Sequence, residues 1–258
     1  MKLIISGATG FVGREVLRQS LSRREITSVV ALARRPVAAA DLDLGPGADP
    51  SKLTSVVVPD YDEYPDAARR EFAGAAACIW TVAITPTKSK MYDFEEVRRV
   101  CQTSALAALR AMREAAAGAA TPAAPFRFLY VSGAGVERSQ GQGKAPPRFY
   151  GEYLAMRGET ENKLLALASE LGGVEVGIAR PGLISAPGAI VRSVLAAVVG
   201  WASGVPSISV TDLAAVMLDQ VIQGLDKEPL MPADLARLAA ESGPANSGRG
   251  GSEGVKEA

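Results

Sequence analysis

The chain alternates short apolar runs with longer segments in which apolar residues recur at helical spacing. The first apolar run begins at Lys2, directly before a glycine-rich turn. Further strand-like runs lie at Ser28–Ala33, Thr54–Val58, Ala76–Val82, Phe126–Ser132, Val174–Ala179 and Ser207–Val210. Strands that alternate with helices predict an α/β fold, a doubly wound parallel sheet with helices on both faces.

One segment between two of these runs keeps helical spacing over a long stretch. The residues at this spacing would form one buried face; they are Val97, Val100, Cys101, Ser104, Ala108, Leu109 and Met112. Gly118 is a suitable end for this helix. Ligands of such sheets bind over the carboxyl ends of the strands, so we expect the chemistry at the residues that end each strand.

The segment KLIISGATGFVGREVL, which starts at Lys2, predicts a buried strand, a glycine turn and a helix. Gly7 allows a tight turn, Gly10 lets backbone N–H groups approach a pyrophosphate, and Gly13 lets the helix pack closely on the sheet. The helix points its positive end at the phosphates. We therefore predict a nucleotide cofactor on this turn, completed by Thr9, Phe11 and Val12; a plain strand-to-helix turn is the alternative.

Composition is typical of one α/β domain. The chain has 258 residues, of which 48% are hydrophobic and 22% charged. We expect one domain over residues 1–240 and a disordered tail over 241–258, which is rich in glycine, serine and charge. The net charge is zero, which argues against nucleic acid as a partner. There is no histidine, which excludes Ser-His-Asp catalysis and nearly every catalytic zinc site, so no metal is expected.

A cytoplasmic location is expected from three observations. The two cysteines, Cys78 and Cys101, lie in apolar segments, where buried thiols are expected rather than a disulfide framework. The first strand begins at Lys2, which leaves no room for a signal peptide before it. The longest apolar run, near Val194 to Val199, is too short to span a bilayer.

Two strand ends suggest which dinucleotide binds. The second strand is followed by Arg34 and Arg35 with no acidic residue, which favours the 2′-phosphate of NADP(H) over the ribose hydroxyl of NAD(H). NAD(H) stays as the alternative, with both arginines as solvated loop residues. The next strand is followed by Asp60, which can accept a hydrogen bond from an adenine amino group or can be an ordinary turn aspartate.

The glycine turn SGATGFVG, the strand FRFLYVSGAG, the run EYLAMRGETENKLL and the later ARPGLI resemble the short-chain dehydrogenase/reductase superfamily of Rossmann proteins. Within this superfamily the chain most resembles the atypical members, the Tat-interacting-protein-like and NmrA-like group. The resemblance implies that Ser132 orients a substrate carbonyl, that Tyr153 is the catalytic tyrosine, and that Arg157 stands where the family has lysine. It also implies two segments that line the nicotinamide end: Thr81, Val82 and Ala83, and then Pro181, Gly182 and Leu183.

These residue types suit hydride transfer. A tyrosine can protonate the developing alkoxide if a nearby cation lowers its pKa, and a cation four residues along a helix shares its face. Arg157 keeps the charge but cannot relay a proton as lysine does. A surface helix with a partly exposed Tyr153 and a solvated Arg157 is the alternative, and Ser132 also fits a plain strand-end turn. Tyr150 has no cation four positions later, so Tyr153 is the better candidate.

Two segments should cover the substrate. The polar loop at about 137–152, between Ser132 and Tyr153, is expected to be a mobile lid. The apolar segment at about 183–206 predicts an apolar or aromatic small-molecule substrate, with helix packing or an oligomer face as the alternative. Next, Thr211 or Asp212 is expected to cap a helix.

Two functions follow from these residues. The first is an NADP(H)-dependent oxidoreductase acting on a small carbonyl or hydroxyl compound. The second is a non-catalytic dinucleotide-binding sensor, which the NmrA-like resemblance allows. Ser132 and Tyr153 favour the enzyme, and Arg157 favours the sensor. A homodimer is expected only by analogy with the superfamily.

Overall fold

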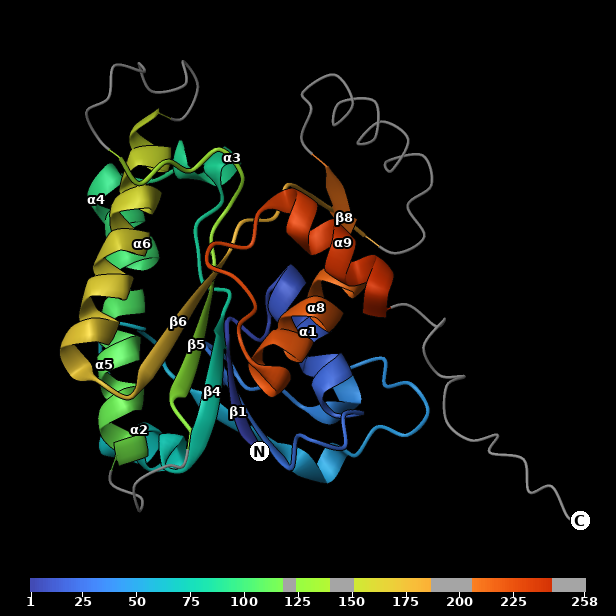
Figure 1. Ribbon diagram of the computed structural model, residues 1–258. Coiled ribbons are helices and arrows are strands. Elements are labelled where there is room, and N and C mark those ends of the chain that lie inside the picture. Colours follow the sequence, from blue (N-terminus) through green and yellow to red (C-terminus); the bar gives the residue numbers. More distant parts are fainter. Residues whose placement is uncertain (118–123, 140–150, 187–205, 243–258) are drawn as a thin grey trace, which may run out of the picture.

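The computed structural model is built on a six-stranded parallel sheet, and it describes residues 1–117, 124–139, 151–186 and 206–242 (Figure 1). The strand order is β3-β2-β1-β4-β5-β6. The bounds are β1 (Lys2–Ser6), β2 (Ser28–Ala33), β3 (Leu53–Val57), β4 (Ala75–Trp80), β5 (Phe126–Val131) and β6 (Val174–Ala179). The order reverses direction between β1 and β4, which is the switch point where such sheets bind ligands. The predicted doubly wound α/β fold is confirmed.

Helices cover both faces of the sheet (Figure 1). On one side lie α1 (Phe11–Ser20), α8 (Val210–Gln223) and α9 (Pro232–Ser242); on the other lie α2 (Asp66–Phe72), α5 (Ser104–Ala117) and α6 (Gly151–Leu171). Successive strand side chains point to opposite faces, so Leu3 and Ile5 pack toward α1 and α8, whereas Ile4 packs on the α5 side. Two apolar cores result, one on each face.

The long helix before β5 is interrupted by one wide turn. α4 (Phe94–Arg98) continues through a π-helical turn (Arg99–Thr103) into α5. The predicted buried face is confirmed at Val97, Cys101, Ser104, Ala108, Leu109 and Met112, while Val100 is only partly buried. The predicted end at Gly118 lies outside the described residues.

A small second sheet follows the ARPG segment. β7 (Leu183–Ser185) pairs in parallel with β8 (Ser207–Ser209), and β7 was not predicted from the sequence. The prediction that Thr211 or Asp212 caps the next helix is wrong. The cap is Ser209, whose Oγ accepts a hydrogen bond from the Asp212 backbone N–H at 3.0 Å, so α8 begins one residue earlier than Thr211.

The remaining elements are short. They are α3 (Pro86–Ser89) and two 3₁₀ turns, Ala39–Asp41 and Pro50–Lys52. Most of the predicted lid and most of the predicted substrate-covering segment, including Val194–Val199, lie outside the described residues, as does Tyr150. α9 continues to Ser242, two residues into the range predicted as a tail.

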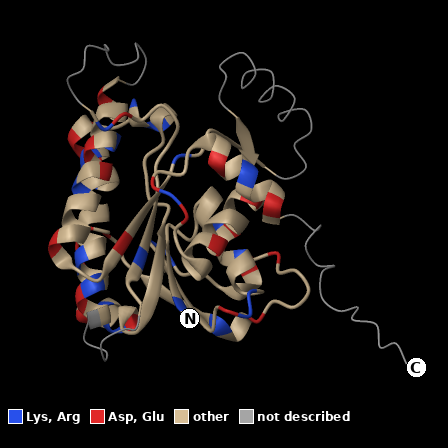
Figure 2. Ribbon diagram, viewed as in Figure 1, with Lys and Arg blue, Asp and Glu red and all other residues tan. Residues whose placement is uncertain are grey.

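Charges of both signs are mixed along the helices and loops, and few lie on the strands (Figure 2). Within the described ranges, no helix combines the length and apolar character needed to cross a membrane. Both cysteines are buried and unpaired, as predicted.

Candidate active site

The turn after β1 is shaped by its glycines. Gly7 has a φ of +76°, a conformation that other residues adopt at a cost, and its N–H donates to the Leu32 carbonyl at 3.0 Å. A Cβ on Gly13 would lie 2.3 Å from the Gly7 carbonyl oxygen, so only glycine lets α1 approach the turn this closely. These are the geometric roles predicted for Gly7 and Gly13.

The front of the turn is open to a ligand. A Cβ on Gly10 would meet only the Gly7 carbonyl oxygen, at 3.1 Å, and Gly10 precedes α1 without a side-chain cap. The first-turn amides of α1 have no partner within the helix, because they precede the first regular hydrogen bond. The turn therefore suits an anionic group such as a pyrophosphate.

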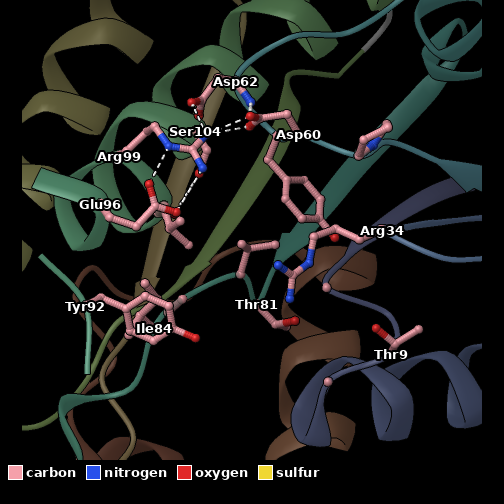
Figure 3. A pocket seen from close by; sticks show the side chains of 17 residues that line it. Thr9, Arg34, Asp60, Asp62, Thr81, Ile84, Tyr92, Glu96, Arg99 and Ser104 are labelled. Atoms are coloured by element: carbon pink, nitrogen blue, oxygen red, sulfur yellow. Dashed lines mark hydrogen bonds and ion pairs between the residues drawn. The ribbon is translucent and has the colours of Figure 1, made fainter. Parts of the chain in front are cut away.

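A cavity of about 240 Å³ extends from this turn over the carboxyl ends of β2, β3 and β4 (Figure 3). Eight of the predicted cofactor residues line it: Gly7, Thr9, Gly10, Arg34, Asp60, Thr81, Val82 and Ala83. Thr81 Oγ donates to the Ser6 carbonyl at 2.7 Å and so fixes the β4 end beside the turn. The fold thus brings together residues from four separate chain segments.

The other predicted cofactor residues lie elsewhere. Phe11 is 54% exposed on α1, and Val12 is partly buried. Gly13 lies against the Gly7 carbonyl, where it lets α1 approach the turn. The Pro181 carbonyl accepts from the Ala134 N–H at 2.9 Å. Neither Pro181, Gly182 nor the 45% exposed Leu183 lines the cavity.

Arg99 forms ion pairs with three carboxylates that also line the cavity. Its guanidinium pairs with Asp60 at 2.8 Å, Asp62 at 2.7 Å and Glu96 at 2.7 Å (Figure 3). Burial alone would raise the pKa of Asp60, but the Asp62 backbone N–H and the Arg99 guanidinium outweigh it and hold that pKa below its ordinary value. Asp60 is thus a charged carboxylate that already has a strong partner.

The two arginines after β2 face different hollows. Arg34 lines the main cavity, whereas Arg35 lines a second hollow together with Thr9, Arg14 and Asp41. The Arg14 guanidinium donates to the Asp41 carbonyl, which holds it beside Arg35. Thr9 borders both hollows, so three cations, Arg34, Arg35 and Arg14, lie next to the open glycine turn.

Tyr153 and Arg157 are both buried, at 8% and 2% exposure, so the surface-helix alternative is wrong. The Tyr153 hydroxyl donates to the Ile84 carbonyl at 2.9 Å, and Ile84 lines the cavity. Burial raises the pKa of Tyr153, while the positive charge of Arg157 opposes this effect.

Arg157 is a buried cation without a carboxylate partner among the described residues. Its Nη2 donates to the Val131 carbonyl at 2.6 Å, and its guanidinium lies 4.7 Å from the Tyr130 ring centre and 6.0 Å from that of Tyr153. Its Nη1 is buried and has no hydrogen-bond partner in the part of the chain that the structure describes. A buried donor without a partner is costly, and a ligand oxygen would satisfy it.

Ser132 belongs to a different network. Its hydroxyl donates to Glu161 Oε1 at 2.6 Å, and Glu161 is fully buried on α6. The same carboxylate pairs with Arg180 at 2.5 Å and Arg138 at 2.8 Å. Ser132 and Tyr153 thus lie at the same end of the sheet but hydrogen-bond to different partners.

Several residues of the site were not found from the sequence. Tyr61, Asp62, Ile84, Tyr92, Glu96, Arg99, Val100 and Ser104 also line the cavity. Arg14 could have been found, because it follows the glycine turn by one residue and is the first cation after it. Glu161 gave a signal too: it follows Arg157 by four residues, which places both charges on one face of the helix.

Comparisons with known proteins agree with this geometry. Residues 7–223 match a family model described as NAD(P)H-binding. The chain belongs to this NAD(P)H-binding family. The predicted resemblance to atypical short-chain dehydrogenase/reductases is thereby confirmed, and so is a dinucleotide-binding fold.

Solved structures share the fold at low sequence identity. The dTDP-glucose 4,6-dehydratase DesIV from Streptomyces venezuelae, solved with NAD bound, is 18% identical with a TM-score of 0.62, over 93% of this chain and 80% of DesIV. The PhqB reductase domain from Penicillium fellutanum is 16% identical with a TM-score of 0.60, over 87% of this chain and 65% of that domain.

One curated relative is a much larger protein. The hybrid PKS-NRPS synthetase mycA of Thermothelomyces thermophilus is 30% identical over an alignment 238 positions long, which covers 85% of this chain. The chain spans only 6% of the length of that synthetase.

Proposed function

We propose that this chain is an NADP(H)-dependent oxidoreductase that interconverts a carbonyl and a hydroxyl group on a small molecule. The observation that supports this most is the Ile84 contact. One cavity reaches from the glycine turn to Ile84, and the Ile84 carbonyl holds the hydroxyl of the buried Tyr153. A dinucleotide laid along this cavity would bring its reactive end next to a tyrosine proton.

The proposed cofactor contacts use the open glycine turn, the arginines beside it and one buried donor of Arg157. The turn at Gly7 to Gly13 would hold the pyrophosphate, and Arg34, Arg35 and Arg14 would hold the 2′-phosphate by charge-assisted hydrogen bonds. The unpartnered Nη1 of Arg157 would donate to a ribose hydroxyl at the nicotinamide end. When bound, NADPH supplies the hydride for the reaction.

The chain's own chemical step is a proton transfer. As the substrate oxygen gains negative charge, Tyr153 Oη releases the Ile84 carbonyl and donates its proton to that oxygen. Arg157, beside the ring, then stabilises the tyrosinate that is left, and solvent returns the proton. Because the Ser132 proton points to Glu161, Ser132 can only accept a hydrogen bond, and in this proposal it accepts one from the hydroxyl form of the substrate. An apolar or aromatic substrate remains part of the proposal.

A dinucleotide-binding sensor is the second candidate, and one observation favours it. Both polar side chains of the expected catalytic pair are engaged within the fold, Tyr153 with Ile84 and Ser132 with Glu161. A protein that only senses the cofactor needs the binding half of the site and no free proton donor.

Turnover and binding separate the two candidates. Purified protein is assayed for NADPH oxidation with a panel of aldehydes and ketones, beside its Tyr153→Phe variant and a Tyr150→Phe control. The enzyme proposal expects Tyr153→Phe to lower kcat by about 10²- to 10⁴-fold and Tyr150→Phe to leave it unchanged. Equal rates for wild type and Tyr153→Phe would reject Tyr153 as the proton donor. NADPH binding without turnover of any compound would favour the sensor.

The cofactor preference has its own test. Fluorescence titration with NADPH and NADH should show tighter binding of NADPH, and Arg35→Ala should weaken NADPH binding about tenfold or more while leaving NADH binding unchanged. Tighter binding of NADH by the wild type would overturn the roles proposed for Arg34, Arg35 and Arg14.

A further inference from the structure

Cys101 lies where three parts of the active end meet. It is fully buried in the wide π-helical turn. The Tyr130 hydroxyl donates to that carbonyl at 3.1 Å. The Cys101 sulfur accepts a hydrogen bond from the Ile84 backbone N–H at 3.3 Å and lies 3.7 Å from the Ile84 carbonyl oxygen.

Ile84 connects this sulfur to the proposed proton donor. The carbonyl that the Cys101 thiol contacts is the one that accepts the Tyr153 hydroxyl at 2.9 Å. The Arg157 guanidinium lies beside the rings of Tyr130 and Tyr153. The Tyr130 hydroxyl donates to the Cys101 carbonyl, and the Tyr153 hydroxyl donates to the Ile84 carbonyl. A change at the sulfur therefore acts on the position of the Tyr153 hydroxyl.

We propose that Cys101 is a positioning residue: its sulfur holds the backbone of Ile84, which in turn sets the direction of the Tyr153 hydroxyl beside Arg157. This rests on the proposed function only in so far as Tyr153 is the proton donor; the positioning itself is independent of turnover. The other buried cysteine offers a contrast. Cys78 contacts Ser6 Oγ at 3.9 Å on β4 and takes no part in this arrangement.

The test follows the ionisation of Tyr153 itself. Tyrosinate absorbance in the near ultraviolet is recorded against pH, and the difference between each protein and its Tyr153→Phe counterpart isolates Tyr153. Three backgrounds are compared: Cys101→Ala, which removes the acceptor, Cys101→Ser, which keeps one, and Cys78→Ala, which makes a cavity of the same kind elsewhere.

Burial raises the pKa of Tyr153, and the hydrogen bond that its hydroxyl donates to the Ile84 carbonyl, beside the Cys101 sulfur, also favours the protonated form. We therefore expect Cys101→Ala to shift the Tyr153 titration to lower pH, while Cys101→Ser and Cys78→Ala follow the wild type. In an active enzyme the pH profile of kcat moves in the same direction. An unchanged titration in Cys101→Ala, or the same shift in Cys78→Ala, overturns the proposal. If the wild type turns over no substrate, the proposed function fails, but the titration still decides the role of Cys101.

Discussion

The glycine turn after β1 and the buried charges of α6 form the two halves of the candidate site, and they are built in opposite ways. The turn is made of backbone: Gly7 bends the chain, Gly13 lets α1 approach, and Gly10 leaves the front open. The α6 half is made of charged side chains. Arg157 and Glu161 are both buried, four residues apart, yet among the residues that the structure describes only Glu161 has partners of opposite charge.

This difference predicts which substitutions destabilise each half of the site. A tight backbone turn is destabilised when a side chain is added, because there is no space for it. A buried charge cluster is destabilised when one charge is removed, because a buried charge is then left without a partner of opposite sign. The unpaired Arg157 makes the α6 half costly by itself, which is typical of a site kept for function rather than stability.

The largest effect is expected at Glu161. Glu161→Gln leaves the buried Arg180 without its counter-charge, whereas Arg138 keeps Glu228, so the free energy of unfolding should fall by about 3 to 5 kcal/mol. Urea unfolding at neutral pH measures this loss. Glu175→Gln is the matched control, since Glu175 is 39% exposed in its pair with Arg127 and should lose less than about 1 kcal/mol. Similar losses of stability in both variants would contradict the expectation that the buried ion pairs of Glu161 contribute more than the exposed pair of Glu175.

An intermediate effect is expected in the turn. Gly13→Ala places a Cβ 2.3 Å from the Gly7 oxygen, so it should lower the free energy of unfolding by about 1 to 3 kcal/mol and abolish NADPH binding. Gly10→Ala meets only one atom, at 3.1 Å, and should weaken NADPH binding with a smaller loss of stability. The measurements are urea unfolding and fluorescence titration. If Gly10→Ala bound NADPH normally, the pyrophosphate would not lie on this turn.

The smallest effect appears only at alkaline pH and concerns Tyr61, whose hydroxyl donates to the same Leu32 carbonyl as the Gly7 N–H. Burial raises the pKa of Tyr61 from 10.0 to about 12. The unfolded chain therefore loses this proton first. The stability that the protonated Tyr61 contributes is complete below about pH 10 and is lost as the pH rises toward 12.

The loss due to Tyr61 should be on the order of 2 kcal/mol. Tyr61→Phe should show a smaller decline of stability than the wild type across this window, although it is less stable at neutral pH because one hydrogen bond is missing. Urea unfolding of both proteins at neutral and alkaline pH measures the difference. Parallel declines would mean that Tyr61 ionises as freely in the folded chain as in the unfolded one.

Much of the fold could be predicted because it follows from local patterns. The predicted bounds of β2 and β6 agree with the structure, and those of β3 and β4 differ by one or two residues at their ends. The roles of Gly7 and Gly13 in shaping the turn also needed only the residues around them. The cap of α8 was misplaced because Ser209 and Thr211 are both good caps, and only the fold determines which of them ends β8.

The sequence by itself therefore determined the alternation of strands and helices, the glycine turn and the place of Tyr153 and Arg157 on one helix. Only the tertiary structure decided their partners. It joined Tyr153 to Ile84 across 69 residues and Ser132 to Glu161 across 29, and it surrounded Arg99 with three carboxylates. Backbone conformation depends mainly on neighbouring residues, whereas the partners of a buried polar group come from whichever elements the sheet order brings beside it.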